Sequence, residues 1–254
     1  MNSYLSEAGH WYDKEGRPAY RVIGNNGQER KATLRDARKL DLVPSVTTIL
    51  SISAKPALEN WKVDQALTAA TTIHKIEGES VDEFKSRAKY EARQIGRLAA
   101  DRGTEIHAEI ERGFVLGERN TSFVSVKSLL DSLYPDEEWV AEDSFCSTLG
   151  YGGKIDLYSK SGIFVDFKTK DNLEGKEAKT LAYDDHGMQL SAYAEGMGFS
   201  EPTRLSIFID RADPSVLIHH QWDSASHRRH FDMFYSLLLF WKLSKNYDPA
   251  RATQ

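Results

Sequence analysis

The sequence predicts a β-sheet covered by helices, of the α/β or α+β class. Helical periodicity dominates the chain up to about residue 134, and from residue 139 apolar and polar residues alternate as they do in strands. Two later helical segments are interleaved with these strands. Of the 254 residues, 40% are hydrophobic and 28% are charged, a balance typical of a folded protein with a substantial core. This composition excludes a disordered chain, a collagen and a coiled coil.

The N-terminal half of the chain is expected to be mostly helical. Its expected elements are a short strand near Tyr20–Ile23 and helices over Leu34–Leu40, Pro56–Ala70 and 82–113. The last of these is one long helix or two abutting helices, because Gly96 and Gly103 are weak points in the helical pattern. Tyr134-Pro135 ends a second helical stretch, since proline blocks the continuation of a helix.

The C-terminal half alternates between strands and helices. Strands are expected over Trp139–Phe145, Lys154–Tyr158, Ile163–Lys168, Arg204–Asp210 and Val216–Trp222, and helices over about 186–198 and Ser224–Ser244. Ser159–Gly162 supplies a turn between the second and third strands. This order of elements is the one that predicts a helix-covered sheet.

The charge balance and the single cysteine narrow the function classes. Lys plus Arg number 33 and Asp plus Glu number 38, so the net charge is −5. That charge argues against a protein that coats nucleic acid by bulk attraction, but it leaves open an enzyme that grips nucleic acid locally. Because Cys146 is the only cysteine, the sequence excludes an intramolecular disulfide, a cysteine-ligated zinc site and a four-cysteine iron–sulfur cluster.

Nothing in the sequence points to a membrane or an export route. The longest apolar run, Leu237–Trp241, is far shorter than the roughly 20 residues of a membrane span. The N-terminus lacks the residue order of a signal peptide or a transit peptide. We therefore expect a soluble, cytoplasmic protein with no membrane partner.

The segment Lys154–Lys168 holds the residues that carry chemistry. Its second strand has three apolar side chains on one face, Ile163, Val165 and Phe167. Asp166 and Lys168 then lie together on the opposite face. On the first strand, Asp156 is expected to point away from its apolar neighbours Ile155 and Leu157. A hairpin of this length brings Asp156 and Asp166 close together.

Two carboxylates a few ångströms apart repel each other, and a divalent cation with oxygen ligands compensates that repulsion. Lys168 can then orient a water molecule or stabilise negative charge on a phosphate, so the set describes phosphodiester hydrolysis. The alternative is a surface hairpin with an ordinary cross-strand pair. Acid-x-Lys triplets occur five times, but only Asp166-x-Lys168 lies in an apolar alternation behind a Gly-x-x-Asp strand.

Two helical pairs flank this hairpin in the sequence. His107 and Glu111 are four residues apart and share a helix face, and Gln189 and Tyr193 do the same downstream. Each pair alone is more typical of the edge of a packed core than of a ligand set. Because one pair precedes the hairpin and the other follows it, the interpretation as a ligand set gains weight.

The order His, Gly-x-x-Asp, Asp-x-Lys-Thr, Gln-x-x-x-Tyr over residues 102–193 resembles the RecB-like branch of the PD-(D/E)xK nuclease superfamily. Leu42–Leu50, followed by Pro56 and Trp61, is similar to the N-terminal part of phage-type exonucleases related to the mitochondrial genome-maintenance exonuclease. The resemblance implies a restriction-endonuclease-like core, a central mixed sheet flanked by helices, with a helical N-terminal extension. Residues 1–254 would be a single nuclease domain, with 1–80 as the extension and 81–254 as the core.

The resemblance also implies roles for individual residues. The implied metal ligands are His107, Asp156, Asp166 and the backbone carbonyl of Phe167. Glu111 would complete a second metal site or lie behind the first. Lys168 would be the catalytic lysine, while Gln189 and Tyr193 would line the site and help to place the DNA strand. Oxygen ligands with one imidazole favour Mg²⁺ or Mn²⁺, and without cluster cysteines no iron–sulfur cluster is expected.

Candidate DNA contacts lie outside the hairpin. Basic residues recur every four positions on the long helix that leads to Arg102, namely Lys85, Lys89, Arg93 and Arg97. A solvated face paired with acids explains this ridge about as well as phosphate binding does. Arg228 and Arg229 lie near a helix N-terminus, where positive charge opposes the helix dipole. We therefore expect these two side chains to contact the DNA backbone.

Candidates for base stacking are Trp61, Tyr151 and Tyr193. For Trp61, packing in the core is the better explanation.

The hairpin chemistry and the resemblance together predict a metal-dependent DNA exonuclease. The resemblance alone implies that it acts on single-stranded DNA or DNA ends in phage-type recombination, repair or degradation. Its partners would be DNA and a recombination or single-strand-binding protein, in the host cytoplasm if a phage encodes it. The alternatives are a structure-specific endonuclease with the same site and a non-catalytic nucleic-acid-binding accessory protein of recombination. No ligand spacing supports zinc near His227–His230, and no phosphate-binding glycine loop indicates an ATP-driven motor.

Overall fold

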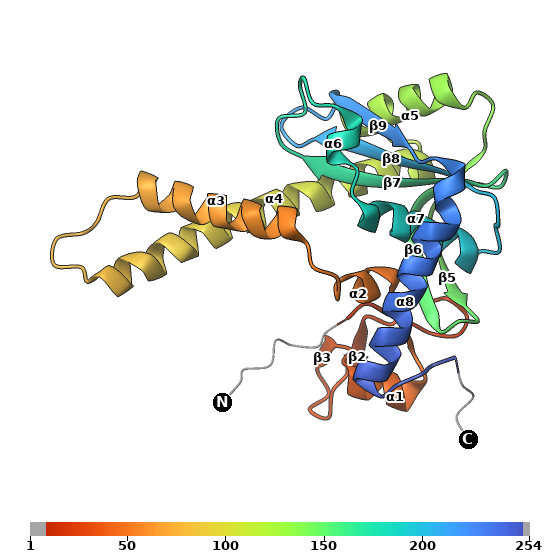
Figure 1. The fold of residues 1–254 in the computed structure, drawn as a ribbon, viewed down its shortest axis with the longest axis horizontal. Helices are drawn as coiled ribbons and strands as arrows, with labels where there is room; N and C mark the ends of the chain where they lie inside the picture. Colours follow the sequence, from red (N-terminus) through yellow and green to blue (C-terminus); the bar gives the residue numbers. More distant parts are fainter. Residues whose placement is uncertain (1–8, 251–254) are drawn as a thin grey trace.

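The computed structural model describes residues 9–250, which form a mixed α/β fold (Figure 1). The N-terminal elements are β1 (Trp11–Tyr12), β2 (Arg21–Ile23), β3 (Glu29–Lys31), α1 (Leu34–Leu40), β4 (Val43–Pro44), α2 (Val46–Leu50), α3 (Pro56–Thr72), α4 (Val81–Leu116) and α5 (Thr121–Leu133). The C-terminal elements are β5 (Trp139–Ser147), β6 (Tyr151–Ser159), β7 (Ile163–Lys170), α6 (Ala178–Leu181), α7 (Asp184–Gly196), β8 (Thr203–Asp210), β9 (Leu217–Gln221), the short 3₁₀ helix η1 (Ser224–Ser226) and α8 (His227–Lys245). Within residues 9–250, no helix has the length and hydropathy needed to cross a membrane.

A five-stranded sheet in the order β5-β6-β7-β8-β9 forms the centre of the fold. Strands β7 and β8 are parallel, and the other neighbours are antiparallel. The connection from β7 to β8 carries α6 and α7, as a parallel pair requires. Strand β6 begins earlier than expected because Gly152 and Gly153 still pair with β5 despite the low strand propensity of glycine. The expected mixed sheet flanked by helices is present.

Two hydrophobic clusters cover the two faces of this sheet. On one face, α4 and α5 pack on apolar side chains of β7 and β8, including Ile163, Val165 and Phe167. On the other face, α2, α7 and α8 pack around a cluster that contains Phe164. The predicted alternation of β7 is therefore confirmed, and it leaves Asp166 on the face that α7 covers.

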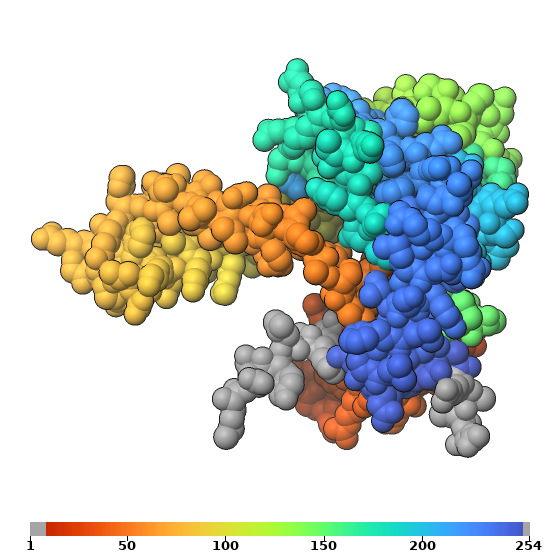
Figure 2. All heavy atoms as spheres, in the orientation of Figure 1, coloured from red at the N-terminus to blue at the C-terminus, as the bar shows by residue number. Residues whose placement is uncertain are grey.

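Helix α3 and the first half of α4 form a two-helix arm that projects from the body of the molecule (Figure 1). In the space-filling view of Figure 2 the arm stands clear of the N-terminal strands. Helix α4 is continuous over 36 residues, so of the two alternatives the single long helix is correct. Ser80 and Glu83 form a capping box at its start, and two guanidinium nitrogens of Arg87 bind the Glu79 carboxylate in the preceding turn.

The two glycines in the helical pattern of α4 both lie where another element approaches. At Gly103, a β-carbon would come within 2.8 Å of Thr169 Oγ1 on β7, so glycine lets the helix lie unusually close to the strand. At Gly96, a β-carbon would lie 3.6 Å from the Trp61 ring, which is an ordinary contact. The expected weak points are therefore contact points within an unbroken helix.

We expect Gly96→Ala and Gly103→Ala to have opposite effects on stability. Alanine at position 96 should stabilise the protein by about 0.5–1 kcal/mol, because it favours the helix without a clash. Alanine at position 103 should destabilise it by about 1–3 kcal/mol, because the new β-carbon pushes α4 away from β7. Equilibrium urea unfolding measures both effects, and an equal stabilisation of the two variants would contradict the close approach at Gly103.

Candidate functional site

A cavity of about 290 Å³ opens where the β6–β7 hairpin meets α4, α7 and the N-terminal strands. Its lining residues are His10, Tyr12, Tyr20, Ser45, Thr47, His107, Gly153, Lys154, Asp156, Asp166, Lys168, Gln189 and Tyr193. Six of these are residues that the sequence assigns to the site, namely His107, Asp156, Asp166, Lys168, Gln189 and Tyr193. The fold thus gathers side chains from widely separated segments around one space.

The two strands of the hairpin separate at this cavity. Backbone pairing between β6 and β7 includes Leu157 opposite Val165, and one further step would place Asp156 opposite Asp166. The pairing ends there, and Asp156 Oδ2 instead accepts a hydrogen bond of 2.9 Å from the backbone N–H of Phe167. The opened strands leave room for both carboxylates to face the cavity.

Strand β6 changes face at Asp156. Ile155 and Leu157 would share a face in a regular strand, yet they are buried in different hydrophobic clusters. On the neighbouring strand, Glu142 stands opposite Asp156 and adopts φ 59°, a conformation that non-glycine residues seldom take. The regular alternation expected around Asp156 is therefore wrong, because both strands are irregular at this position.

Hydrogen bonds connect Asp166 and Lys168 to helix α7. Lys168 Nζ lies 2.7 Å from Asp166 Oδ1 and 3.2 Å from Gln189 Oε1. The Gln189 amide donates to Asp166 Oδ1 at 2.8 Å and to the Tyr193 hydroxyl at 3.0 Å. Gln189 and Tyr193 therefore share a face of α7, as their spacing predicts.

Burial dominates the electrostatics of this pair. Asp166 is 1% exposed, and desolvation raises its pKa, with the Asp156 charge adding to the rise and Lys168 opposing it. Desolvation alone would lower the pKa of Lys168, but the charges of Asp166 and Asp156 outweigh it and raise that pKa. Lys168 is thus a cation held beside two carboxylates in a largely dry place.

Helix α4 places His107 next to Asp156. His107 Nδ1 lies 3.8 Å from Asp156 Oδ2, and the imidazole packs edge-on against the Phe167 ring at a centroid distance of 6.0 Å. Gly103 lies one helical turn before His107 on α4. Its close approach to β7 therefore sets how near the imidazole comes to the carboxylates.

The donor set matches a hard divalent cation in type, although it is not closed around one. In the part of the chain that the structure describes, no three His, Cys, Asp or Glu side chains converge as a metal cluster. Asp166 Oδ2 is buried there without a hydrogen-bond partner, a costly arrangement that a bound cation would relieve. Two carboxylates and an imidazole therefore fit such a cation. The carbonyl of Phe167 as a further ligand stays a prediction.

Glu111 does not line the cavity. Burial raises the pKa of Glu142, and the charges of Asp156 and Glu111 add to that rise. Lys154, which the sequence analysis does not assign a role, lines the cavity and forms an ion pair with Glu142. Glu111 thus belongs to this neighbouring charge cluster, and its role in a second metal site stays a prediction.

The basic residues expected to contact DNA from α4 do not line the cavity. Lys85, Lys89 and Arg93 are exposed on the arm, and Lys85 lies 3.4 Å from the Asp82 carboxylate. Arg102 is half-buried and forms an ion pair of 2.7 Å with Glu105. The exposed ridge is therefore present on the arm.

Arg228 and Arg229 are exposed on α8 and also lie outside the cavity lining. Arg228 pairs with Asp232 at 2.9 Å, and Arg229 pairs with Asp184 at 3.0 Å. These ion pairs offset the unfavourable position of the two arginines near a helix N-terminus.

The base-stacking role expected for Tyr151 is wrong. Its side chain is fully buried against Phe234, and its hydroxyl donates to the backbone carbonyl of Ala192 at 2.9 Å. Tyr193 is 4% exposed, so its ring face is not open to a base either, although it lines the cavity. Trp61 is half-buried on the arm, where its ring lies against α4 at Gly96 and outside the hydrophobic clusters of the sheet, so its role in base stacking stays a prediction.

The N-terminal wall of the cavity was not predicted from the sequence. It consists of His10, Tyr12, Tyr20, Ser45 and Thr47. A parallel bridge between Ser45 and Gly152 and the pairing of β1 with β4 hold this wall against β6. No local pattern signals such a contact, because it joins segments that are far apart in the chain.

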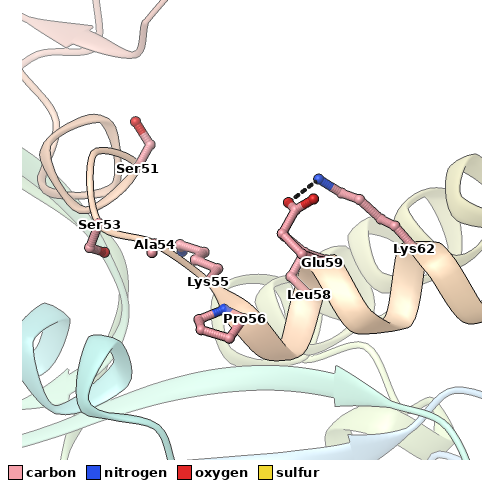
Figure 3. Close-up of a pocket in the computed structure, with 8 residues that line it drawn as sticks. All are labelled: Ser51, Ser53, Ala54, Lys55, Pro56, Leu58, Glu59 and Lys62. Carbon is pink, nitrogen blue, oxygen red and sulfur yellow. Dashed lines mark hydrogen bonds and ion pairs between the residues drawn. The ribbon is translucent and has the colours of Figure 1, made fainter.

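A wider hollow of about 530 Å³ lies at the base of the arm, where α2 leads into α3 (Figure 3). Lys55 and Lys62 line it, and each has an acidic partner. Lys62 pairs with Glu59 at 2.7 Å, and Lys55 pairs with Asp185 of α7 at 3.1 Å. The second pair fastens the base of the arm to the helix that carries Gln189.

Comparison with known structures gives several distant likenesses. An alkaline exonuclease (LHK-Exo) from Laribacter hongkongensis matches with 15% identity over 74% of this chain and 94% of that chain, at a TM-score of 0.39. The same enzyme in complex with dAMP matches with 13% identity over the same shares, also at 0.39. The crystal structure of SSO0001 matches with 15% identity over 71% of this chain and 85% of that chain, at 0.31. No family model and no curated protein matches. Likenesses this low assign neither a fold family nor a function.

The stability of the protein should fall between pH 7 and pH 5, with His186 as a principal cause. His186 is 5% exposed at the start of α7, and burial, with the charge of Lys168, lowers its pKa from 6.5 to about 4. The folded state therefore resists protonation where the unfolded chain accepts it, so stability is lost as the pH falls below 6.5.

His186 alone should account for about 2 kcal/mol of this loss by pH 5. Urea unfolding of the wild type and of His186→Asn at both pH values measures its share. If the two proteins lost the same stability on acidification, His186 would not be the group responsible.

Proposed function

We propose that the protein is a metal-dependent DNA exonuclease that hydrolyses phosphodiester bonds in single-stranded DNA or at DNA ends. The observation that carries this proposal is the ion pair between the buried Asp166 and the partly exposed Lys168, which faces a cavity beside Asp156 and leaves one carboxylate oxygen without a partner. The sequence motifs that resemble RecB-like nucleases favour the same chemistry. They also favour Mg²⁺ or Mn²⁺ and a role in phage-type recombination, repair or degradation.

In this proposal each side chain of the site has a separate task. His107, Asp156 and Asp166 would hold the cation, which when bound activates a water molecule and neutralises charge on the phosphate. Lys168 presents a fixed positive charge to the phosphate or to the attacking water, because two carboxylates keep it protonated. Gln189 positions Asp166 and Lys168 through contacts with both.

The size of the cavity favours a single strand as the substrate. A volume of about 290 Å³ is at the lower end of the range for small-molecule sites, about 300–1,000 Å³. Such a space suits one nucleotide unit of a strand better than a whole base pair. The exposed lysines and arginines of the arm would then hold the backbone of the same strand by charge attraction.

Asp166→Asn and Lys168→Gln should each lower cleavage of end-labelled single-stranded DNA by on the order of a thousandfold. The first removes a charge that would hold the cation, and the second removes the positive charge presented to the phosphate. Lys160→Ala is the matched control, since Lys160 is an exposed residue in the turn of the same hairpin. Cleavage is measured with Mg²⁺, with Mn²⁺ and with a chelator, and circular dichroism checks that each variant is folded.

The same assay separates the rival functions. Cleavage of circular single-stranded DNA would identify an endonuclease, since an exonuclease needs an end. DNA binding without cleavage in any divalent cation would identify a non-catalytic binding protein. Full activity of Lys168→Gln would contradict the proposed role of Lys168 in hydrolysis.

Removing charge from the arm should weaken DNA binding in a salt-dependent way. Lys89→Ala/Arg93→Ala should lower the slope of log affinity against log salt by about 1.4, because each lost phosphate contact contributes about 0.7 on a single strand. Fluorescence anisotropy at several salt concentrations measures the slope.

Arg228→Ala/Arg229→Ala provides the comparison on α8, where both side chains are already ion-paired. An unchanged affinity and slope in that variant would remove the DNA contact expected at α8. An unchanged affinity and slope in the arm variant would show that Lys89 and Arg93 do not contact the DNA.

A further inference from the structure

We propose that the stacked rings of His10 and Tyr20 form a surface on which one nucleobase of the bound strand stacks, directly beside the carboxylate and lysine centre. The two ring centroids lie 4.7 Å apart, with 29° between the ring planes. Both rings line the cavity that contains Asp156 and Lys168. This inference deepens the proposed function and rests on it, because it names the part of the substrate that the N-terminal wall would recognise.

The rings are held in place from behind. The Tyr20 hydroxyl lies 2.6 Å from the Tyr12 hydroxyl, and the two rings meet edge to face. Tyr12 is 2% exposed and packs on Gly152, where a β-carbon would come within 3.0 Å of its ring. Tyr20 is therefore attached to a buried residue that cannot easily move.

The backbone of His10 is fixed as well. The backbone N–H of Ser45 donates to the carbonyl of His10 at 2.9 Å, and the N–H of His10 donates to Thr48 Oγ1 at 3.3 Å. Both contacts tie His10 to the start of α2. A surface held in this way loses little entropy when a ring stacks on it, which favours binding.

Exposure distinguishes this pair from the other two tyrosines that line the cavity. Tyr12 and Tyr193 are 2% and 4% exposed, so their faces are covered by protein. Tyr20 is half-buried and His10 is exposed. An aromatic pair that stays open to solvent in the wall of a cavity matches the stacking surfaces that bind single strands.

The position of Tyr20 links this surface to the reacting groups. Tyr20 lines the same cavity as Lys154, Lys168 and Tyr193. A base stacked on the pair would therefore share this cavity with the phosphate that Lys168 faces. Since every base has a flat face, this surface would hold a strand without sequence preference.

The test measures stacking without cleavage, in the Asp166→Asn background. The probe is a short single-stranded oligonucleotide with one 2-aminopurine, whose fluorescence is quenched by stacking, placed in turn at the first three positions from each end. We expect quenching at one position. Tyr20→Leu should abolish this quenching and lower the affinity on the order of tenfold. Tyr20→Phe should preserve most of both, because it loses the hydroxyl bond to Tyr12 but keeps the ring and its edge-to-face contact.

Tyr235→Leu is the matched control, since Tyr235 is a partly exposed tyrosine on α8 outside the cavity. A strand that lacks the base at the quenched position should bind the parent protein on the order of tenfold more weakly, and Tyr20→Leu should add no further loss. Equal losses for intact and abasic strands, or an equal loss in Tyr20→Phe, would overturn the stacking surface, and so would absence of quenching at every position.

Failure of the proposed function gives a different result. In that case the parent protein with intact Asp166 cleaves no DNA in Mg²⁺ or Mn²⁺. The quenching and abasic-strand measurements remain informative then, because neither requires cleavage.

Discussion

The ion pair that Lys168 forms with the buried Asp166 is the constraint on which the rest of the site depends. A carboxylate that is 1% exposed keeps its charge only if protein donors and cations replace water around it. Lys168 and Gln189 both contact its Oδ1, and this requires α7 to pack with Gln189 facing β7. Strand alternation places the acid and the lysine on one face, and the helix completes their environment. The packing of α7 on β7 is thus constrained by a single pair of charges.

The second constraint is that the site draws on both faces of the sheet. Helix α7 covers the face that carries Asp166, whereas α4 packs on the opposite face and brings His107. An unbroken ladder between β6 and β7 would keep these groups apart. The pairing stops at Asp156, which accepts a hydrogen bond from the neighbouring backbone and lies 3.8 Å from His107. The local loss of regular pairing is therefore what lets side chains from both layers meet.

The sequence predicted those parts of the site that depend on local periodicity. Alternation along β7 and the four-residue spacing of Gln189 and Tyr193 are properties of single elements, so they could be read directly. Tyr151 was misjudged because the strand was expected to begin at Lys154, whereas β6 begins at Tyr151 and buries its side chain. The wall that contains Tyr20 was missed because a bridge between Ser45 and Gly152 positions it, and such a contact leaves no periodic signal. Long-range packing, and not propensity, decided both cases.

The continuity of α4 has a mechanical consequence. A straight helix of 36 residues is about 54 Å long, and the same rod carries the tip of the arm at one end and His107 toward the other. Because Gly103 rests directly against β7, it is a natural fulcrum between these two parts. A load on the free end of the rod is therefore carried along one unbroken helix to the segment of His107, where Ile106 and Ile110 anchor the helix on the sheet.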